Sequence, residues 1–306
     1  MRLLLAKTMT SRSPIRRSAA AILYRFPVPA PSLSGTLFRS GTFEVRIATR
    51  KKEIRKAQRL RYRVFYEEGN AVPDRTAALI RRDICPFDRF CDHLLVIDHS
   101  AVNRFGKPKP KIVGAYRLLR QDVAARHGGF YSAGEFAIAP LLARHPGKRF
   151  LELGRSCVAA AYRTRHTLDL LWRGIALYIE HYRIDVLFGC ASFAGTDPAD
   201  HAAALKFLAE QRPAPDEWRA SALPDRVTAI DLARAPALDA RRALSAMPPL
   251  IKGYLRCGAL VGDGVVVDEQ FGTTDVFVVM PVAQIDPRYL SHFAKDERTK
   301  DERAAA

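Results

Sequence analysis

The chain has 306 residues, 48% of them hydrophobic, and a formal net charge of +17. This length suits one large domain or two small ones, and the apolar content is ordinary for a globular protein. No apolar run approaches the roughly 20 residues of a membrane-spanning helix. The five cysteines are scattered and lack the paired spacing of a zinc site, so we expect no metal and reduced thiols in a cytoplasmic protein.

The positive charge is concentrated at the start of the chain. The first 52 residues carry eleven Lys and Arg against Glu44 alone, and so hold +10 of the +17. A strongly basic surface favours an anionic partner, which can be nucleic acid, anionic lipid or an acidic protein. Zinc-finger spacing, glycine-arginine repeats and RNP-type aromatic motifs are absent from the sequence, so no nucleic-acid partner is expected.

The composition also divides the chain. Residues 1–41 are rich in Arg, Ser, Ala and Pro and contain no acid, which predicts a basic, mobile arm. A short amphipathic piece at 15–26 is suited to a membrane surface, although a transit peptide or an unstructured tail has a similar composition. We expect one folded domain over 42–293 and a charged tail over 294–306.

Hydrophobic periodicity predicts a mixed α/β sheet in a single domain, with a cleft near its central strand. Strands are expected at 43–47, 94–98, 112–119, 150–158, 185–191, 227–232, 265–267 and 276–281. Helices are expected at 52–68, from about 168 to 182, after the Asp197-Pro198 start signal, and at 248–259. The segments 70–89 and 212–248 are expected to be mostly loop.

The segment 150–158 is the most informative, because it places two charges inside an apolar strand. Glu152 and Arg155 would point to opposite faces of a regular strand. A bulge at Gly154 would bring both toward one side. Because buried charges are costly unless they are paired or used, the segment is either a structural ion pair or an active-site strand.

Other charged residues also stand where apolar residues are usual. Arg61 falls on the apolar face of the helix 52–68, and Arg117 shares a strand face with apolar neighbours. Arg163 and Arg165 precede the helix that ends at 182, where the helix dipole and backbone N–H groups attract anions; they are equally consistent with ordinary surface charge.

These residues fall into a pattern that resembles a known family. Leu60-Arg61 with Phe65, then Asp88 and Asp92, then Arg117, then Glu152 with Arg155 is similar to acyl-homoserine-lactone synthases, which have a GNAT-type fold. The segments 151–158, 189–198, 249–256 and 273–275 resemble more closely the bacterial L-ornithine N-alpha-acyltransferases of ornithine-lipid synthesis. Ala71 replaces a Trp of the lactone-synthase pattern, and the two aspartates are four apart rather than three, which argues against signal synthesis.

The resemblance implies transfer of a 3-hydroxyacyl group from acyl carrier protein to the α-amine of L-ornithine, which gives a lyso-ornithine lipid. In this reading Glu152 is the first candidate base and Glu135 the second, with backbone N–H groups at Gly154 as oxyanion donors. Arg155 is counted with these two as a catalytic residue, and Arg61, Arg117 and Arg155 are expected either to bind the acceptor carboxylate or to structure the site. Asp88 or Asp92 is expected to hold the distal ammonium, with Phe65 as a further substrate-binding residue.

The resemblance also implies partners. Acyl carrier proteins are acidic, so a basic surface would steer their docking, and Arg163 and Arg165 are candidates for the phosphopantetheine phosphate. No tightly bound cofactor is expected. The lipid product and the basic arm together predict peripheral attachment to an anionic inner membrane. The alternatives are a lactone-type signal synthase, an acyl-coenzyme A-dependent enzyme, and a non-enzymatic basic module for membrane or nucleic acid.

Overall fold

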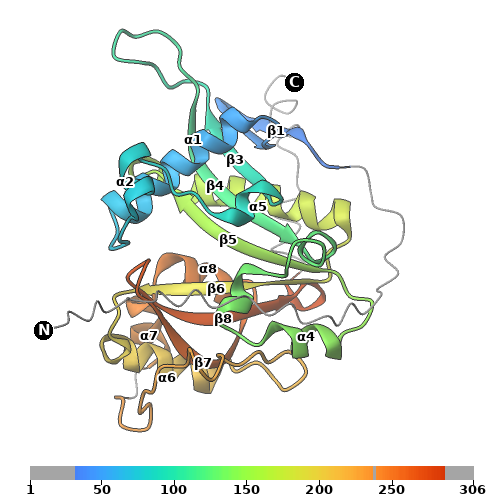
Figure 1. Cartoon of the computed structure of the whole chain (residues 1–306), viewed down its shortest axis with the longest axis vertical. Coiled ribbons are helices and arrows are strands. Elements are labelled where there is room, and N and C mark those ends of the chain that lie inside the picture. Colours follow the sequence, from blue (N-terminus) through green and yellow to red (C-terminus); the bar gives the residue numbers. More distant parts are fainter. Residues whose placement is uncertain (1–31, 237–238, 287–306) are drawn as a thin grey trace, which may run out of the picture.

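The structure, a computed structural model, describes residues 32–236 and 239–286. One sheet runs through it, with its strands in the order β1-β2-β3-β4-β5-β6-β8-β7 (Figure 1). Every neighbouring pair is antiparallel except β5 with β6. The strands are β1 (Gly35–Ser40), β2 (Phe43–Ile47), β3 (Asp92–Asp98), β4 (Lys111–Arg120), β5 (Phe150–Val158), β6 (Val186–Ala194), β7 (Leu260–Asp268) and β8 (Thr273–Pro281). The predicted mixed α/β sheet is therefore confirmed.

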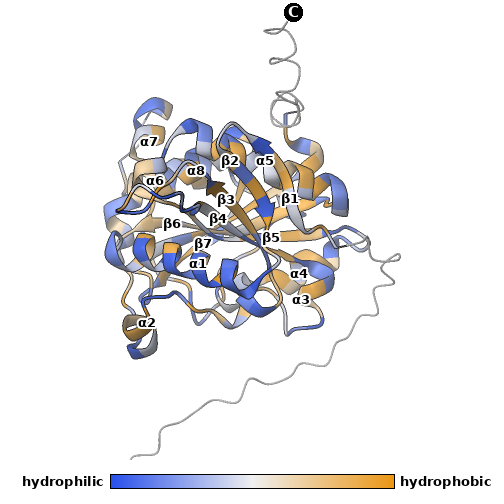
Figure 2. Cartoon of the chain, turned by 90° about the horizontal axis from the view of Figure 1, so that it is seen from above, coloured by the Kyte–Doolittle hydropathy of each residue, from blue (hydrophilic) through white to orange (hydrophobic). Residues whose placement is uncertain are grey.

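Helices cover both faces of this sheet. They are α1 (Lys51–Tyr62), α2 (Arg75–Ile80), α3 (Gln121–Ala124), α4 (Ile138–Arg144), α5 (Arg165–Tyr182), α6 (Ala202–Gln211), α7 (Ala240–Ala246) and α8 (Pro249–Arg256). The strand β3 contributes Leu94 to the apolar cluster under α5 and Leu95 to the cluster under α1, since alternate side chains face opposite ways. Figure 2 shows α1 as mostly hydrophilic, as expected for a helix that buries a single apolar stripe.

The helix expected at 52–68 changes its winding part of the way along. After α1 the chain continues as a π-helical turn, Arg63–Glu67. Such turns shift the side chains that follow relative to a regular α-helix, and they are frequent at functional sites. Here the turn carries Val64 and Phe65 toward the pocket described below.

Several boundaries differ from the sequence-based prediction. Residues 35–40, expected in the basic arm, form β1, because Gly41 adopts a left-handed φ of 53° that closes a tight hairpin to β2. The helix α2 lies in the expected loop 70–89, and α7 lies in 212–248. The strand prediction at 227–232 was wrong, since Val227 makes only an isolated bridge to Val266.

The rest of the arm, residues 1–31, and the predicted tail lie outside the described residues. Within 32–236 and 239–286, we find no helix that combines the length and the apolarity needed to cross a bilayer.

The strands β5 and β6 pair only at their beginnings. The parallel register covers Phe150–Glu152 against Val186–Phe188. Immediately beyond, Gly189 lies so close to Leu153 that an added Cβ would be 2.4 Å from the carbonyl oxygen of Leu153. The carboxyl ends of the two strands then separate, and the space between them opens into a pocket.

The predicted bulge exists, but it lies one residue later than expected. Ala115 of β4 pairs with Cys157 and Arg117 pairs with Gly154, so Arg155 and Ser156 together oppose Tyr116. The residue with the left-handed backbone is Arg155, with a φ of 50°, rather than Gly154. A non-glycine residue in this region is strained, and such strain persists only where the surrounding structure enforces it.

Candidate active site

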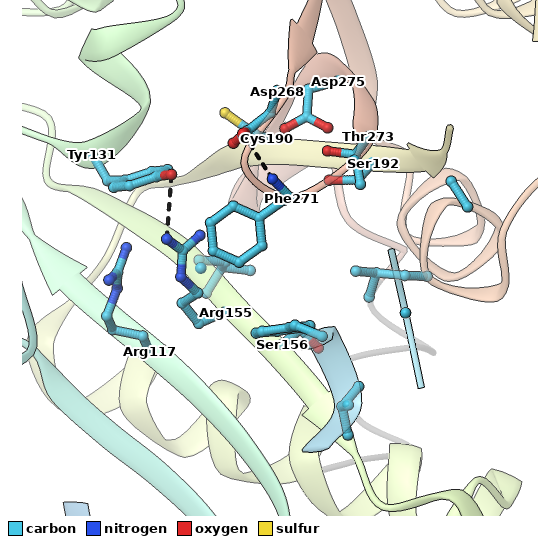
Figure 3. Close-up of a pocket in the computed structure, with 18 of the residues that line it drawn as sticks. Arg117, Tyr131, Arg155, Ser156, Cys190, Ser192, Asp268, Phe271, Thr273 and Asp275 are labelled. Carbon is cyan, nitrogen blue, oxygen red and sulfur yellow. Dashed lines mark hydrogen bonds between the residues drawn. The ribbon is translucent and has the colours of Figure 1, made fainter. Parts of the chain in front are cut away.

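A pocket of about 420 Å³ lies where β5 and β6 separate (Figure 3). Its walls come from β4, β5, β6, the π-helical turn, α8 and the hairpin between β7 and β8. This volume is within the usual range for small-molecule sites. Residues far apart in sequence therefore meet at the centre of the sheet, where the cleft was expected.

Two arginine side chains, one buried and one half-buried, form one side of the pocket. Arg155 lies 4.6 Å from the Tyr131 ring and 4.1 Å from the Phe271 ring, and it donates a hydrogen bond of 3.3 Å to the Tyr131 hydroxyl. Arg117, only 2% exposed, contacts the same Tyr131 ring, with its guanidinium carbon 5.1 Å from the ring centre. Among the described residues, Nη1 of Arg117 and Nε of Arg155 make no hydrogen bond, but they lie 3.8 Å from Oδ1 of Asp88 and 3.6 Å from Oδ2 of Asp83. Both side chains also line the pocket, where guanidinium groups are suited to an anionic ligand.

Glu152 lines the same pocket but is already strongly hydrogen-bonded. Its Oε1 accepts hydrogen bonds from the backbone N–H of Ser132 at 2.7 Å and from the Ser132 hydroxyl at 2.6 Å. Its Oε2 accepts one hydrogen bond of 3.0 Å from the backbone N–H of Tyr131. The carboxylate therefore fixes the short turn that presents the Tyr131 ring to both arginines.

Acidic groups gather on the opposite side of the pocket. Asp275 and Cys190 line it, and Glu135 lies directly behind them. The Cys190 thiol donates a hydrogen bond of 3.2 Å to Oε2 of Glu135. Burial, reinforced by Asp275, raises the pKa of Glu135 to about 7, and burial raises the pKa of Asp275 to about 6. Oδ1 of Asp275 has no hydrogen-bond partner in the described part of the chain.

Asp275, Asp268 and Tyr131 were not identified as site residues from the sequence. The one signal for them was the motif Thr273-Thr274-Asp275, which places a carboxylate at the start of a strongly apolar strand. In the part of the chain that the structure describes, Glu135, Cys190 and Asp275 form a group that could hold a metal ion, with one ligand atom from each within 4.8 Å of the others.

Arg61 and Asp88, expected to bind substrate, instead bind each other outside the pocket lining. Arg61 is 1% exposed and donates hydrogen bonds to Asp88 and to Asp83. Burial alone would raise the pKa of Asp88, but the charge of Arg61 outweighs it and holds this pKa at about 2. Asp92 also lies elsewhere, with Arg120 and the Tyr178 hydroxyl as its partners.

Of the remaining predicted residues, Phe65 lies in the pocket wall, whereas Arg163 and Arg165 do not line the pocket. Phe65 lines the pocket and packs edge-to-face against Phe271. Arg163 forms an ion pair with Glu68, which is itself a lining residue. Arg165 is exposed at the start of α5 and lies 3.8 Å from Asp169. The structure thus brings Glu152, Arg155, Arg117, Phe65 and Glu135 together around one space.

Comparison with known proteins agrees with this architecture. The family model described as an acetyltransferase (GNAT) domain matches residues 60–173. An L-ornithine N(alpha)-acyltransferase of Rhizobium meliloti (strain 1021) is 50% identical over 287 residues, covering 94% of this chain and 93% of the relative. The protein of the same name from Agrobacterium fabrum is 52% identical over 259 residues, covering 85% and 87%.

Among solved structures, FeeM, an N-acyl amino acid synthase from uncultured soil microbes, aligns with a TM-score of 0.46 at 12% identity. That alignment covers 81% of this chain and 92% of FeeM. The sequence relatives, at about half identity over nearly the whole length, carry the assignment. The chain belongs to the family of L-ornithine N(alpha)-acyltransferases.

Proposed function

We propose that this protein transfers an acyl group from a thioester to the α-amine of L-ornithine. The observation that carries the proposal is that guanidinium groups and carboxylates line one pocket of an acyltransferase fold. The amine nitrogen forms a bond to the acyl carbon, the carbon–sulfur bond breaks, and the amine proton passes through a base to the departing thiolate. The products are an N-acyl-ornithine and a free thiol.

Arg117 and Arg155 are the proposed binding groups for the amino-acid carboxylate. Guanidinium groups bind carboxylates with two parallel charge-assisted hydrogen bonds. Both arginines line the pocket, so a bound carboxylate would accept hydrogen bonds from their guanidinium groups. The aromatic rings of Tyr131 and Phe271 hold Arg155 in position.

Glu152 is the proposed general base, acting directly or through a water molecule. It lines the pocket, and within the described residues Oε2 accepts one hydrogen bond, which leaves an acceptor position for the amine. Glu135 is the second candidate, because its pKa of about 7 suits proton transfer near neutral pH. It reaches the pocket only past Cys190, so a water molecule or Asp275 would have to relay the proton.

The bulge in β5 is the proposed oxyanion site. Beyond Glu152 the strand no longer pairs with β6, so its edge at Arg155 and Ser156 faces the pocket. Backbone N–H groups at such an edge stabilise the negative charge that develops on the thioester oxygen. Cys157 is not proposed as a nucleophile, because it is buried and burial raises the pKa of its thiol to about 12.

The proposed acyl donor is a 3-hydroxyacyl group on acyl carrier protein. Arg165 is exposed at the start of α5, and Arg163 lies near the pocket rim through Glu68. These cations suit the phosphate of a phosphopantetheine arm. The amphiphilic product and the basic N-terminal segment support peripheral attachment to an anionic membrane surface.

Mass spectrometry of product formation tests the proposal. Purified protein would be incubated with 3-hydroxyacyl carrier protein, or with the matched coenzyme A thioester, and with ornithine, lysine, homoserine or glycine. We expect N-acyl-ornithine from the carrier-protein donor and a large loss in folded Glu152→Ala and Arg155→Ala variants. Activity retained in both variants would refute the site assignment, and no product with any acceptor would refute the reaction.

A further inference from the structure

The acidic side of the pocket has no role in acceptor binding as derived so far. Asp275 is 5% exposed, lines the pocket, and has one carboxylate oxygen without a hydrogen-bond partner among the described residues. Asp268, half-buried, lines the pocket beside it and accepts hydrogen bonds from the backbone N–H groups of Gln270 and Phe271 through Oδ1. An unpaired carboxylate is costly to bury unless a cation binds to it.

The chemistry of this cluster suits an ammonium group better than a metal ion. A metal would require the Cys190 sulfur as a thiolate. Cys190 instead donates a hydrogen bond to Glu135, and burial raises the pKa of its thiol far above the ordinary value. The carboxylates also open into the same pocket as Arg117 and Arg155 rather than into a closed cage.

The charges in the pocket are arranged like a template for a diamino acid. Arg117 and Arg155 come from β4 and β5, whereas Asp275 comes from β8 and Asp268 from the end of β7 (Figure 3). The ring of Phe271 lines the pocket as well, which offers an apolar surface for a short methylene chain. An acceptor with a carboxylate at one end and an ammonium group at the other complements both sides at once.

We propose that Asp275, assisted by Asp268, binds the distal ammonium group of the acceptor and so selects a diamino acid over its uncharged analogue. Glu135, directly behind Asp275, adds negative charge to this subsite. The inference rests on the proposed function, because it names the part of that site that recognises the acceptor side chain. It replaces Asp88 and Asp92, which the structure places outside the pocket lining.

Acceptor preference measures this subsite directly. The ratio of kcat/KM for ornithine to that for norvaline, which has the same carbon chain without the ammonium group, would be determined for the wild type, Asp275→Asn and Asp268→Asn. Losing a charged hydrogen bond typically weakens recognition by roughly 10- to 100-fold. We expect the ratio to fall by at least about tenfold in Asp275→Asn and by less in Asp268→Asn, mainly through KM for ornithine.

The matched control is Glu269→Gln, because Glu269 is exposed in the same hairpin and does not line the pocket. This variant should keep the wild-type ratio. An unchanged ratio in both aspartate variants would overturn the subsite while leaving the acyl transfer to ornithine intact.

Calorimetric binding of ornithine and norvaline without an acyl donor separates the two proposals. Tighter ornithine binding that Asp275→Asn abolishes would support the subsite even if no acyl transfer occurred. Equal binding of the two amino acids by the wild type would overturn it.

Discussion

Arg61 donates hydrogen bonds to both carboxylate oxygens of Asp88, at 3.0 Å and 2.6 Å, and a third of 2.7 Å to Asp83. This buried network joins α1 to the segment before β3, and Gln58 adds a hydrogen bond to the same Asp88. Arg61 and Asp88, which were expected to bind substrate, therefore hold α1 in place. The turn that follows α1 carries Phe65, which lines the pocket.

Removing the cation of this network should destabilise the protein. Arg61→Ala removes the nearest counter-charge of Asp83 and Asp88 and leaves only the longer contacts to Arg155 at 3.6 Å and Arg117 at 3.8 Å. Breaking a buried ion pair typically costs about 3–5 kcal/mol. We expect a loss of that size in the free energy of unfolding, measured by urea denaturation. Arg59→Ala, an exposed arginine on the same helix, is the control and should change stability by less than about 0.5 kcal/mol. Equal losses in the two variants would contradict the structural role.

Glu135 should make the protein less stable as the pH rises toward neutrality. Its pKa in the folded state, about 7, lies above the ordinary value of 4.5, so the folded state holds this proton more tightly than the unfolded state does. Its contribution is fully present below pH 4.5 and is lost as the pH rises through 7. The shift corresponds to roughly 3 kcal/mol at most.

Glu135→Gln should therefore flatten the decline in unfolding free energy between pH 4.5 and 7. Glu210→Gln, on the exposed side of α6, is the matched control. If the wild type and Glu135→Gln lose stability in parallel across this range, the buried carboxyl does not titrate as described.

The separation of β5 from β6 should depend on Gly189. A methyl group there would lie 2.4 Å from the carbonyl oxygen of Leu153, so Gly189→Ala must push the strands apart. Overpacking of this kind typically lowers the free energy of unfolding by about 1–3 kcal/mol. Gly253→Ala in α8 offers the comparison, because nothing lies within 4 Å of its added Cβ. That variant should gain roughly 0.5–1 kcal/mol from helix propensity.

Arg155 should contribute to acceptor binding through its planar guanidinium group. Arg155→Lys keeps the charge but removes the bidentate geometry and the stacking on Tyr131 and Phe271. We expect KM for ornithine to rise roughly 10- to 100-fold, and the preference for ornithine over putrescine, which lacks the carboxylate, to fall. Arg256→Lys, exposed at the end of α8, should leave both quantities at wild-type values.

Local pattern was enough to predict most of the sheet. The apolar runs of β4, β5 and β8 and the periodicity of α5 appear directly in the sequence, because each element buries its own side chains. The strand β1 was missed because it lies within a basic, proline-rich segment and gains its order by pairing with β2. The strand expected at 227–232 has suitable residues but finds only one bridge.

The site was harder to predict for a physical reason. Glu152 and Arg155 stand out because charge interrupts an apolar strand. Asp275 lines the pocket instead because β8 pairs with β6. The pocket itself opens where β6 separates from β5, just after the close contact between Gly189 and Leu153. Such contacts link segments that are distant in sequence, so they cannot be predicted from the local spacing of residues.

The short pairing between β5 and β6 also affects how the molecule resists opening. Five strands lie on one side of that junction and three on the other, and within the described residues the strand pairing across it covers three residue pairs. A ligand that contacts both Arg155 on β5 and Asp275 on β8 would connect the two parts and oppose their separation. Amide hydrogens at the inner edges of β5 and β6 should therefore exchange with solvent more slowly when the acceptor is bound.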